Sequence, residues 1–163
     1  MPTFNHSDID RLSSELANAS KTVIVTHFKP DGDAMGSSLA MYSFIRQYFN
    51  CKTSIVLNDR YPRSIAFMST PEIENDILVY GENPEDTLST ICGADHIIAL
   101  DFNAFHRTDR LESALTESHA YKVLIDHHLS PDTDAFDLIF SYQEISSASE
   151  LLYHILKSSP QCD

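Results

Sequence analysis

The sequence has few cysteines, few basic residues and no long apolar run. Its three cysteines are odd in number, far apart and without a C-x-x-C pair, which excludes a disulfide framework and a thiolate zinc site. No run of about 18 apolar residues exists to form a transmembrane helix, and the first residues lack a basic leader and an apolar signal segment. We therefore expect a cytoplasmic protein with reduced thiols and no membrane partner.

Basic residues are scarce, because 11 Lys and Arg stand against 24 Asp and Glu, a formal net charge of −13. This imbalance argues against a groove that binds long duplex nucleic acid through its phosphates. A small phosphate substrate remains compatible, since bound metal ions reverse the local sign of an acidic pocket. The length of 163 residues and the 42% hydrophobic content suit one domain with a buried core.

Short β-branched apolar runs predict strands that are buried on both faces, at 21–27, 53–58, 76–80, 96–101, 121–126 and 137–140. Helical patterns alternate with them at 8–19 (capped by Ser7), 37–49, 62–68, 84–92, 108–118 and 147–157. This alternation predicts an α/β fold in which helices flank a parallel sheet on both faces, in three αβα layers.

Residues of metal-ligand type follow three of the six predicted strands, whereas the other three end in Asn58, Tyr80 and Phe140. In chain order they are His27, Asp31 and Asp33, then Asp101, then Asp126, His127 and His128. Ligands of open α/β sheets bind at the carboxyl ends of the strands. Each group also has an ordinary explanation, as a tight turn, a helix cap or a surface pair. Their common position at one sheet edge favours a functional site.

The residue types predict a centre for two metal ions. His27 and Asp31 suit one ion, Asp33 and His127 suit a second, and Asp101 lies between them as a bridging carboxylate. Carboxylates and imidazoles without thiolates favour Mn²⁺ or Mg²⁺. Two such ions about 3.5–4 Å apart stabilise the attacking and leaving oxygens of phosphoryl transfer.

Small residues surround the first ligand group. Gly32 and Gly36 allow close approach of the backbone. Ser37 and Ser38 are expected at the start of a helix, where they cap it or receive a phosphate oxygen.

Three segments resemble the motifs of the DHH phosphoesterase family. "HFKPDGDAMGSSLAMYSF" is similar to its first motif, H-x-x-P-D-G-D-A-x-G-S, "ALDFNAFHRTD" to its second, and "IDHH" to its third. The later "EISSASELLYHIL" resembles the Ser-rich helix start of the nanoRNase/3′-phosphoadenosine-5′-phosphate phosphatase branch. The similarity covers about 20–157, so the resemblance assigns 1–163 as a DHH domain, the N-terminal catalytic part of such proteins.

The resemblance implies two Mn²⁺ ions, held by the five residues named above, and a metal-bound hydroxide that attacks phosphorus. It implies that Asp101, His127 and His128 are catalytic, with His128 in contact with the substrate phosphate. Asp126 is expected to orient an imidazole by accepting its other N–H. The implied substrates are short oligoribonucleotides or 3′-phosphoadenosine 5′-phosphate.

The chain departs from the family pattern at its end, where a fourth motif resembling G-I-x-x-D-T-G and a smaller substrate-binding domain are absent. We expect these 163 residues to be the N-terminal piece of a longer protein and weak or inactive alone. Lys29, Arg60, Arg63 and Arg107 are candidates for remaining phosphate contacts.

Four other readings stay open: a family II-type inorganic pyrophosphatase, a RecJ-like single-strand exonuclease, a non-catalytic module that binds nucleotide or metal, and a purely structural cation site. Pyrophosphate hydrolysis without action on dinucleotides would favour the first. The last predicts that Asp101→Ala lowers the melting temperature and leaves activity intact. Dimerisation of this chain is also possible.

Overall fold

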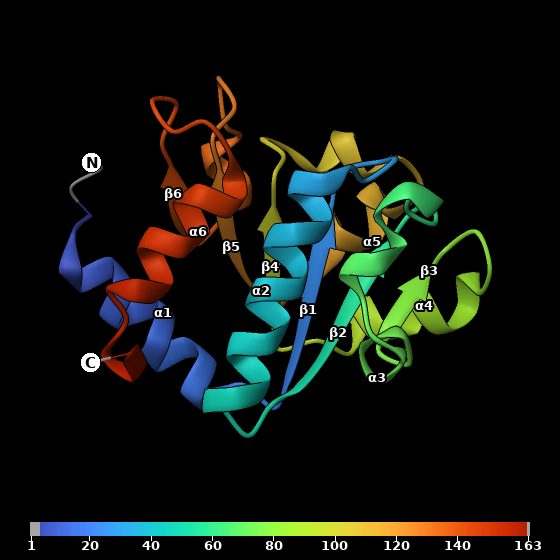
Figure 1. Ribbon diagram of the computed structural model, residues 1–163, viewed down its shortest axis with the longest axis horizontal. Helices are drawn as coiled ribbons and strands as arrows, with labels where there is room; N and C mark the ends of the chain where they lie inside the picture. Colours follow the sequence, from blue (N-terminus) through green and yellow to red (C-terminus); the bar gives the residue numbers. More distant parts are fainter. Residues whose placement is uncertain (1–3, 163) are drawn as a thin grey trace.

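Six strands form one parallel sheet in the computed structural model, which describes residues 4–162 (Figure 1). They are β1 (Lys21–Thr26), β2 (Lys52–Leu57), β3 (Ile77–Val79), β4 (His96–Leu100), β5 (Tyr121–Asp126) and β6 (Leu138–Ser141). Their order is β3-β2-β1-β4-β5-β6, so the direction of winding reverses between β1 and β4. Such a reversal opens a crevice at the carboxyl ends of the two central strands.

Helices cover both faces of the sheet, which confirms the predicted three-layer α/β fold. The helices are α1 (His6–Asn18), α2 (Gly32–Tyr48), α3 (Pro71–Glu74), α4 (Pro84–Cys92), α5 (Glu112–Glu117) and α6 (Ala148–Lys157). α1, α2 and α6 lie on one face, and α4 and α5 lie on the other (Figure 1). Within residues 4–162 no helix has the length and apolar character needed to cross a membrane.

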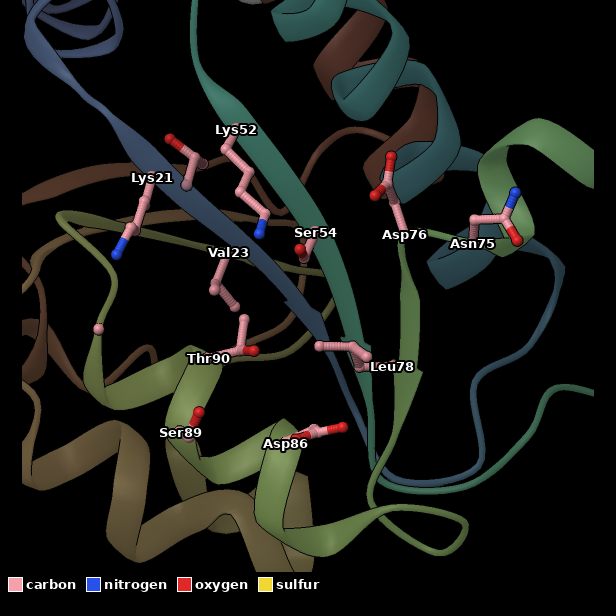
Figure 2. Close-up of a pocket in the computed structure, with 12 residues that line it drawn as sticks. Lys21, Val23, Lys52, Ser54, Asn75, Asp76, Leu78, Asp86, Ser89 and Thr90 are labelled. Carbon is pink, nitrogen blue, oxygen red and sulfur yellow. The ribbon is translucent and has the colours of Figure 1, made fainter.

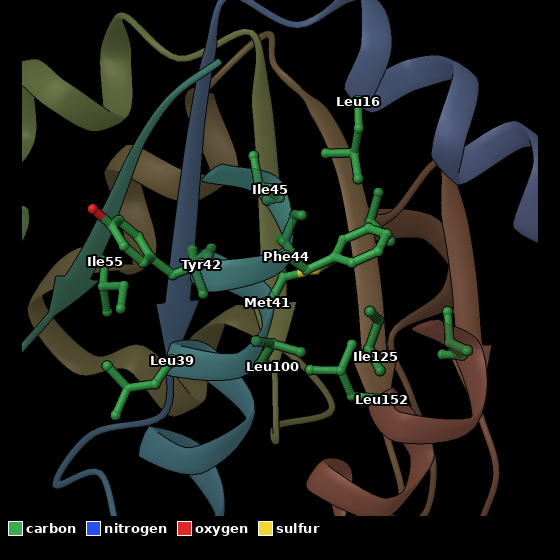
Figure 3. Packing of buried hydrophobic residues seen from close by; sticks show 14 of the residues in the cluster. Leu16, Leu39, Met41, Tyr42, Phe44, Ile45, Ile55, Leu100, Ile125 and Leu152 are labelled. Atoms are coloured by element: carbon green, nitrogen blue, oxygen red, sulfur yellow. The ribbon is translucent and has the colours of Figure 1, made fainter. Parts of the chain in front are cut away.

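Two apolar clusters lie on opposite sides of the sheet, because successive strand side chains point to opposite faces. Ile24 of β1 belongs to the cluster on the side of α1, α2 and α6, part of which Figure 3 shows, whereas Val23 and Val25 belong to the cluster on the side of α4 and α5. Both faces of the central strands are therefore buried. This explains why β1 and β4 are continuous apolar runs in the sequence.

Two helices begin earlier than predicted, because an acidic or amide side chain caps them first. The Asn5 side chain accepts the N–H of Ser7 and starts α1, so Ser7 is not its cap. The Asp31 side chain accepts the N–H groups of Asp33 and Ala34 and starts α2 at Gly32, five residues before the predicted Ser37. Asp and Asn are strong N-caps, and here they precede the apolar periodicity from which a helix start is predicted.

The predicted helix 108–118 is wrong in one part. Asp109 has a φ of 55°, in the left-handed region, and forms a kink inside the 3₁₀ helix η2 (Phe105–Leu111), so the regular helix α5 begins only at Glu112. The predicted segment 62–68 forms another 3₁₀ helix, η1 (Arg63–Met68), and α3 was not predicted. Two further 3₁₀ turns are η3 (Thr133–Ala135) and η4 (Pro160–Cys162).

Candidate metal centre

The carboxyl ends of β1, β4 and β5 lie side by side and bring the predicted ligands together. β4 pairs with β1 on one side and with β5 on the other. Leu100, its last residue, is level with Thr26 and with Ile125. The residues that follow these positions therefore lie at one edge of the sheet, at the point where the winding reverses.

Asp101 lies at the centre of this group. Its side chain is only 4% exposed, and its two oxygens face different histidines. Oδ2 is 3.7 Å from Nε2 of His27, and Oδ1 is 3.4 Å from Nε2 of His127. Asp101 also has a φ of 66°, a left-handed conformation that Asp tolerates better than most residues and that is found at functional sites.

Two groups of donor atoms share Asp101. One comprises His27, Asp31 and Asp101, the other Asp101, His127 and His128, and within each group the donor atoms lie within 4.8 Å of one another. Oxygen ligands lie about 2.1 Å from an ion such as Mg²⁺, so two ligand atoms on one ion stand about 3–4 Å apart. The distances around Asp101 thus fit one ion on each side of the carboxylate.

Hydrogen bonds select the proton position on two of the imidazoles. Nδ1 of His27 lies 2.8 Å from the carbonyl oxygen of Phe28, and Nδ1 of His128 lies 2.7 Å from Oδ1 of Asp126. Carbonyl and carboxylate oxygens only accept, so Nδ1 carries the proton in both rings. Nε2 of each ring then keeps a free lone pair, as a metal ligand or a phosphate contact requires.

Asp126 is fully buried and holds His128 twice. Its Oδ1 accepts the ring N–H, and its Oδ2 accepts the backbone N–H of His128 at 3.1 Å. The His128 side chain is 44% exposed, whereas Asp101 beside it is 4% exposed. His128 therefore lies on the solvent-exposed side of the group, and the buried Asp126 holds it in place.

The electrostatics of the centre favour a cation. The carboxylate of Asp101 raises the pKa of His27, and burial of the ring opposes this shift. Burial also raises the pKa of Asp101, with a further contribution from Asp33, while His27 opposes the rise. A buried carboxylate near other acids, with its nearest imidazoles beyond ordinary hydrogen-bond length, lacks a strong partner. A divalent ion would supply one.

Asp31 and Asp33 lie at the N-termini of two helices. Oδ1 of Asp31 caps α2 and is 4.0 Å from Nε2 of His27. Asp33 instead accepts the N–H groups of Ala148 at 2.7 Å and Ser149 at 2.9 Å, the first two residues of α6. Positive helix N-termini therefore offset the charge of both carboxylates.

The structure places Asp33 beside the second group but outside it. Its Oδ2 is 3.8 Å from Nε2 of His127, whereas the His128 nitrogen nearest Asp101 is Nδ1, at 3.9 Å, whose proton is donated to Asp126. The amides of α6 that hold Asp33 were not foreseen from the sequence. The sequence signal for this contact is limited to the Ser-rich start of that helix, because nearly every residue type has a backbone N–H.

The phosphate contact predicted for Ser37 is wrong. Ser37 lies in the second turn of α2, is fully buried, and donates its hydroxyl to the carbonyl oxygens of Asp33 and Ala34. Ser38 is likewise buried and donates to the Ala34 carbonyl. Ser37 thus steadies the backbone of Asp33 and does not face the site.

Close approach of the backbone, which we expect at both Gly32 and Gly36, occurs at Gly36. A Cβ on Gly36 would lie 3.3 Å from Oγ of Ser149 and 3.3 Å from Cε of Met68, so Gly36 permits close packing of α2 against α6 and η1. A Cβ on Gly32 would meet nothing within 4 Å. Close approach of the chain is therefore required only at Gly36, and its partner is protein.

The basic candidates divide into paired and less constrained side chains. Arg60 forms ion pairs with Glu82 at 2.6 Å and Glu74 at 3.0 Å, so it is not free to contact phosphate. Nζ of Lys29 lies 5.0 Å from the centre of the Phe28 ring, next to His27. The carbonyl of Arg107 accepts the N–H of Phe28 at 2.7 Å, which attaches η2 to the same loop.

The cavity in Figure 2 lies apart from the candidate metal centre. Its volume is about 380 Å³, and residues near the amino ends of β1, β2 and β3 and along α4 line it. Lys21 and Lys52, which are among them, lie at the first positions of β1 and β2. The candidate ligands lie at the opposite ends of the strands.

The family follows from the comparison with known sequence families. The model of the DHH family, N-terminal domain, matches residues 21–162. The chain belongs to the DHH family. Among curated proteins, it is 25% identical over 141 residues to a probable manganese-dependent inorganic pyrophosphatase of Streptococcus equi subsp. zooepidemicus, covering 86% of this chain and 42% of that protein.

Solved structures agree with this assignment. An exopolyphosphatase-related protein from Bacteroides fragilis superposes with a TM-score of 0.91 and 34% identity, over 99% of this chain and 46% of that one. An exonuclease RecJ bound to manganese has a TM-score of 0.54 and 14% identity, over 97% and 38%, which shows a shared fold alone. The chain spans less than half the length of each of these proteins.

Proposed function

We propose that this chain carries the metal centre of a Mn²⁺-dependent phosphoesterase that acts on short oligoribonucleotides or 3′-phosphoadenosine 5′-phosphate. The observation that carries the proposal is the geometry of Asp101, whose two oxygens face His27 and His127 at 3.7 and 3.4 Å. A carboxylate placed in this way would be able to bind one ion through each oxygen. The family membership and the manganese in the names of two relatives support the choice of metal.

The ligands divide around Asp101. His27 and Asp31 would hold one ion, Asp33 and His127 the other, and Asp101 both. When bound, two such ions supply an activated water and neutralise the charge that develops on a transferring phosphoryl group. Mg²⁺ suits the same oxygen-rich set.

His128 contacts the substrate phosphate in this proposal. The ring is the most exposed of the three site histidines. Its Nδ1 is bonded to Asp126, so Nε2 lies on the side of the ring away from the Asp126 carboxylate. A neutral ring would accept a hydrogen bond from a protonated phosphate, and a protonated ring would donate to an anionic one. Catalysis by Asp101, His127 and His128 thus rests on three adjacent positions around one crevice.

A small substrate agrees with the charge of the chain. With a net charge of −13, the chain does not favour a long polyanion, whereas the metal ions themselves attract one phosphate group. The Ser-rich start of α6 favours the nanoRNase branch. Lys29 and Arg107, next to the loop of His27, are the best-placed cations for a second phosphate.

Pyrophosphate is the second candidate substrate. It is favoured by the match over 86% of this chain to a probable manganese-dependent inorganic pyrophosphatase. The same pair of ions serves an ester and an anhydride, because both reactions displace an oxygen at phosphorus. Contacts to the leaving group, a nucleoside or a phosphate, would decide between them.

The test is Mn²⁺-dependent release of mononucleotide from a 5′-phosphorylated diribonucleotide, with pyrophosphate and 3′-phosphoadenosine 5′-phosphate assayed in parallel. The 163-residue chain is compared with a longer version of the length of its relatives. Activity that Mn²⁺ restores after chelation and that Asp101→Asn removes is the expected result. Hydrolysis of pyrophosphate alone would favour the second candidate, and nucleotide binding without turnover in both versions would contradict an enzymatic role.

A further inference from the structure

Asp33 is held by a segment that lies more than a hundred positions away in the chain. Its Oδ2 accepts the N–H of Ala148 at 2.7 Å, and its Oδ1 accepts the N–H of Ser149 at 2.9 Å. The Ser149 hydroxyl also donates to the backbone carbonyl of Asp33 at 3.3 Å. Both oxygens of this predicted ligand are therefore fixed by the first turn of α6.

These two N–H groups belong to the first turn of α6, where backbone N–H groups have no partner within the helix. Ser147 caps the helix by accepting the N–H of Glu150 at 3.0 Å, and the Glu150 carboxylate accepts the N–H of Ser146 at 3.2 Å. This arrangement satisfies the N–H of Glu150 but not those of the two residues before it. The N–H groups of Ala148 and Ser149 remain for Asp33, and each carboxylate oxygen still has a lone pair beyond them.

α6 is fixed to the protein by contacts that do not involve the site. Leu151, Leu152 and Ile155 are buried on its inner face. Because Gly36 has no side chain, α2 packs closely beside Ser149. The position of the two amides is therefore set by the core. Two fixed donors leave the Asp33 carboxylate little freedom to rotate, and its Oδ2 stays 3.8 Å from Nε2 of His127.

We propose that the N–H groups of Ala148 and Ser149 are positioning groups for the second metal ion, and that they do so by orienting Asp33. The inference rests on the proposed two-metal function. The carboxylate ligands of the two ions would then be oriented differently. Asp31 is oriented by the helix that it caps, α2, whereas Asp33 is oriented by a separate helix, α6. Loss of an orienting partner of a metal ligand typically lowers metal affinity about 10–100-fold.

Ala148→Pro tests the inference. Pro is favoured at the first helical position, and Ser147 has the extended backbone (φ −158°, ψ 155°) that the residue before a proline prefers. The substitution therefore removes one N–H and pushes the Asp33 carboxylate away while α6 can still form. Ala148→Gly keeps the N–H, and Ser147→Ala weakens the start of α6 without touching Asp33, so both serve as controls.

The measurements are the binding of Mn²⁺ by calorimetry and the electron paramagnetic resonance spectrum, in which two coupled Mn²⁺ ions differ from a single one. We expect Ala148→Pro to weaken the second ion at least about 10-fold and to show the single-ion spectrum, while both controls keep the coupled spectrum. Circular dichroism checks folding. If Ala148→Pro does not fold, Ser149→Pro, which removes the other N–H, replaces it with the same expectation.

Two results would overturn the inference, and they differ. If the unsubstituted chain and Ala148→Pro both bind two ions with equal affinity, the amides of α6 do not position Asp33, and the proposed function stands. If the unsubstituted chain binds no second ion at saturation, the two-metal function itself fails and the inference fails with it.

Discussion

The two ends of the sheet use aspartate in opposite ways. At the amino ends of the strands, Oδ2 of Asp95 accepts the N–H groups of Ser20 and Lys21, both at 2.8 Å. At the carboxyl ends, Asp101 has no such donor among residues 4–162, and its oxygens face imidazole nitrogens at 3.4 and 3.7 Å. The pKa of Asp95 is lowered by its backbone hydrogen bonds, whereas burial raises the pKa of Asp101.

The difference separates carboxylates that stabilise the fold from those that cost stability. A carboxylate that accepts backbone N–H groups is stabilised in its charged form, as Asp95 is. A buried carboxylate without donors destabilises the protein unless a cation binds. An acidic composition alone does not distinguish the two kinds, but the partners of each oxygen do. Substitutions at the carboxyl end of the sheet and at its amino end test this contrast.

The largest effect is expected for Asp101→Asn. Since it removes the proposed bridging ligand, Mn²⁺-dependent hydrolysis should fall at least about 100-fold, more than the loss typical of residues that only orient ligands. The melting temperature of the metal-free protein should stay equal or rise, because the amide removes a buried charge and Asn also tolerates the left-handed backbone. A lower melting temperature with unchanged activity would instead indicate a structural cation site.

Asp126→Asn should have the next largest effect. Asp126 holds the His128 ring in one tautomer through a 2.7 Å hydrogen bond, and an amide in its place can donate to Nδ1 and reverse that tautomer. We expect a loss of about 10–100-fold in kcat/KM, with both Mn²⁺ ions still bound. Steady-state kinetics and metal titration check the two parts. An equal loss of metal would contradict the role of His128 at the phosphate.

The strands and the meeting of their polar ends could be predicted from the sequence. In a parallel sheet the carboxyl ends of all strands lie at the same edge, so residues that follow different strands come close together. The start of α2 was placed wrongly, since Asp31 lies in a polar segment where the apolar period gives no signal. The break at Asp109 was missed because a left-handed φ on a non-glycine residue is not visible in composition. The bond from Asp33 to α6 depends on tertiary packing alone.

At the amino end, Asp95→Ala should lower stability and spare activity. It removes the acceptor of two backbone N–H groups where β1 begins, so we expect a fall of about 2–4 °C in melting temperature and activity within about twofold. The lowered pKa of Asp95 makes its contribution fully present above the ordinary carboxyl pKa. The difference between the two proteins should therefore shrink in acid, as pH falls through the folded-state pKa. A difference independent of pH would contradict this origin.

The smallest effect concerns Tyr42 of α2, whose hydroxyl donates to Asp76 just before β3. Burial and this bond raise the pKa of Tyr42 to about 12, from about 10 in an unfolded chain. The protonated hydroxyl is then favoured by folding, so its contribution is full below pH 10 and is lost as pH rises toward 12. Tyr42→Phe keeps the ring and removes the proton. Its melting temperature should fall less steeply between pH 10 and 12 than that of the unsubstituted protein, while other buried tyrosines give both proteins the same background. Parallel slopes would show that neither burial nor the bond to Asp76 raises the pKa of Tyr42 on folding.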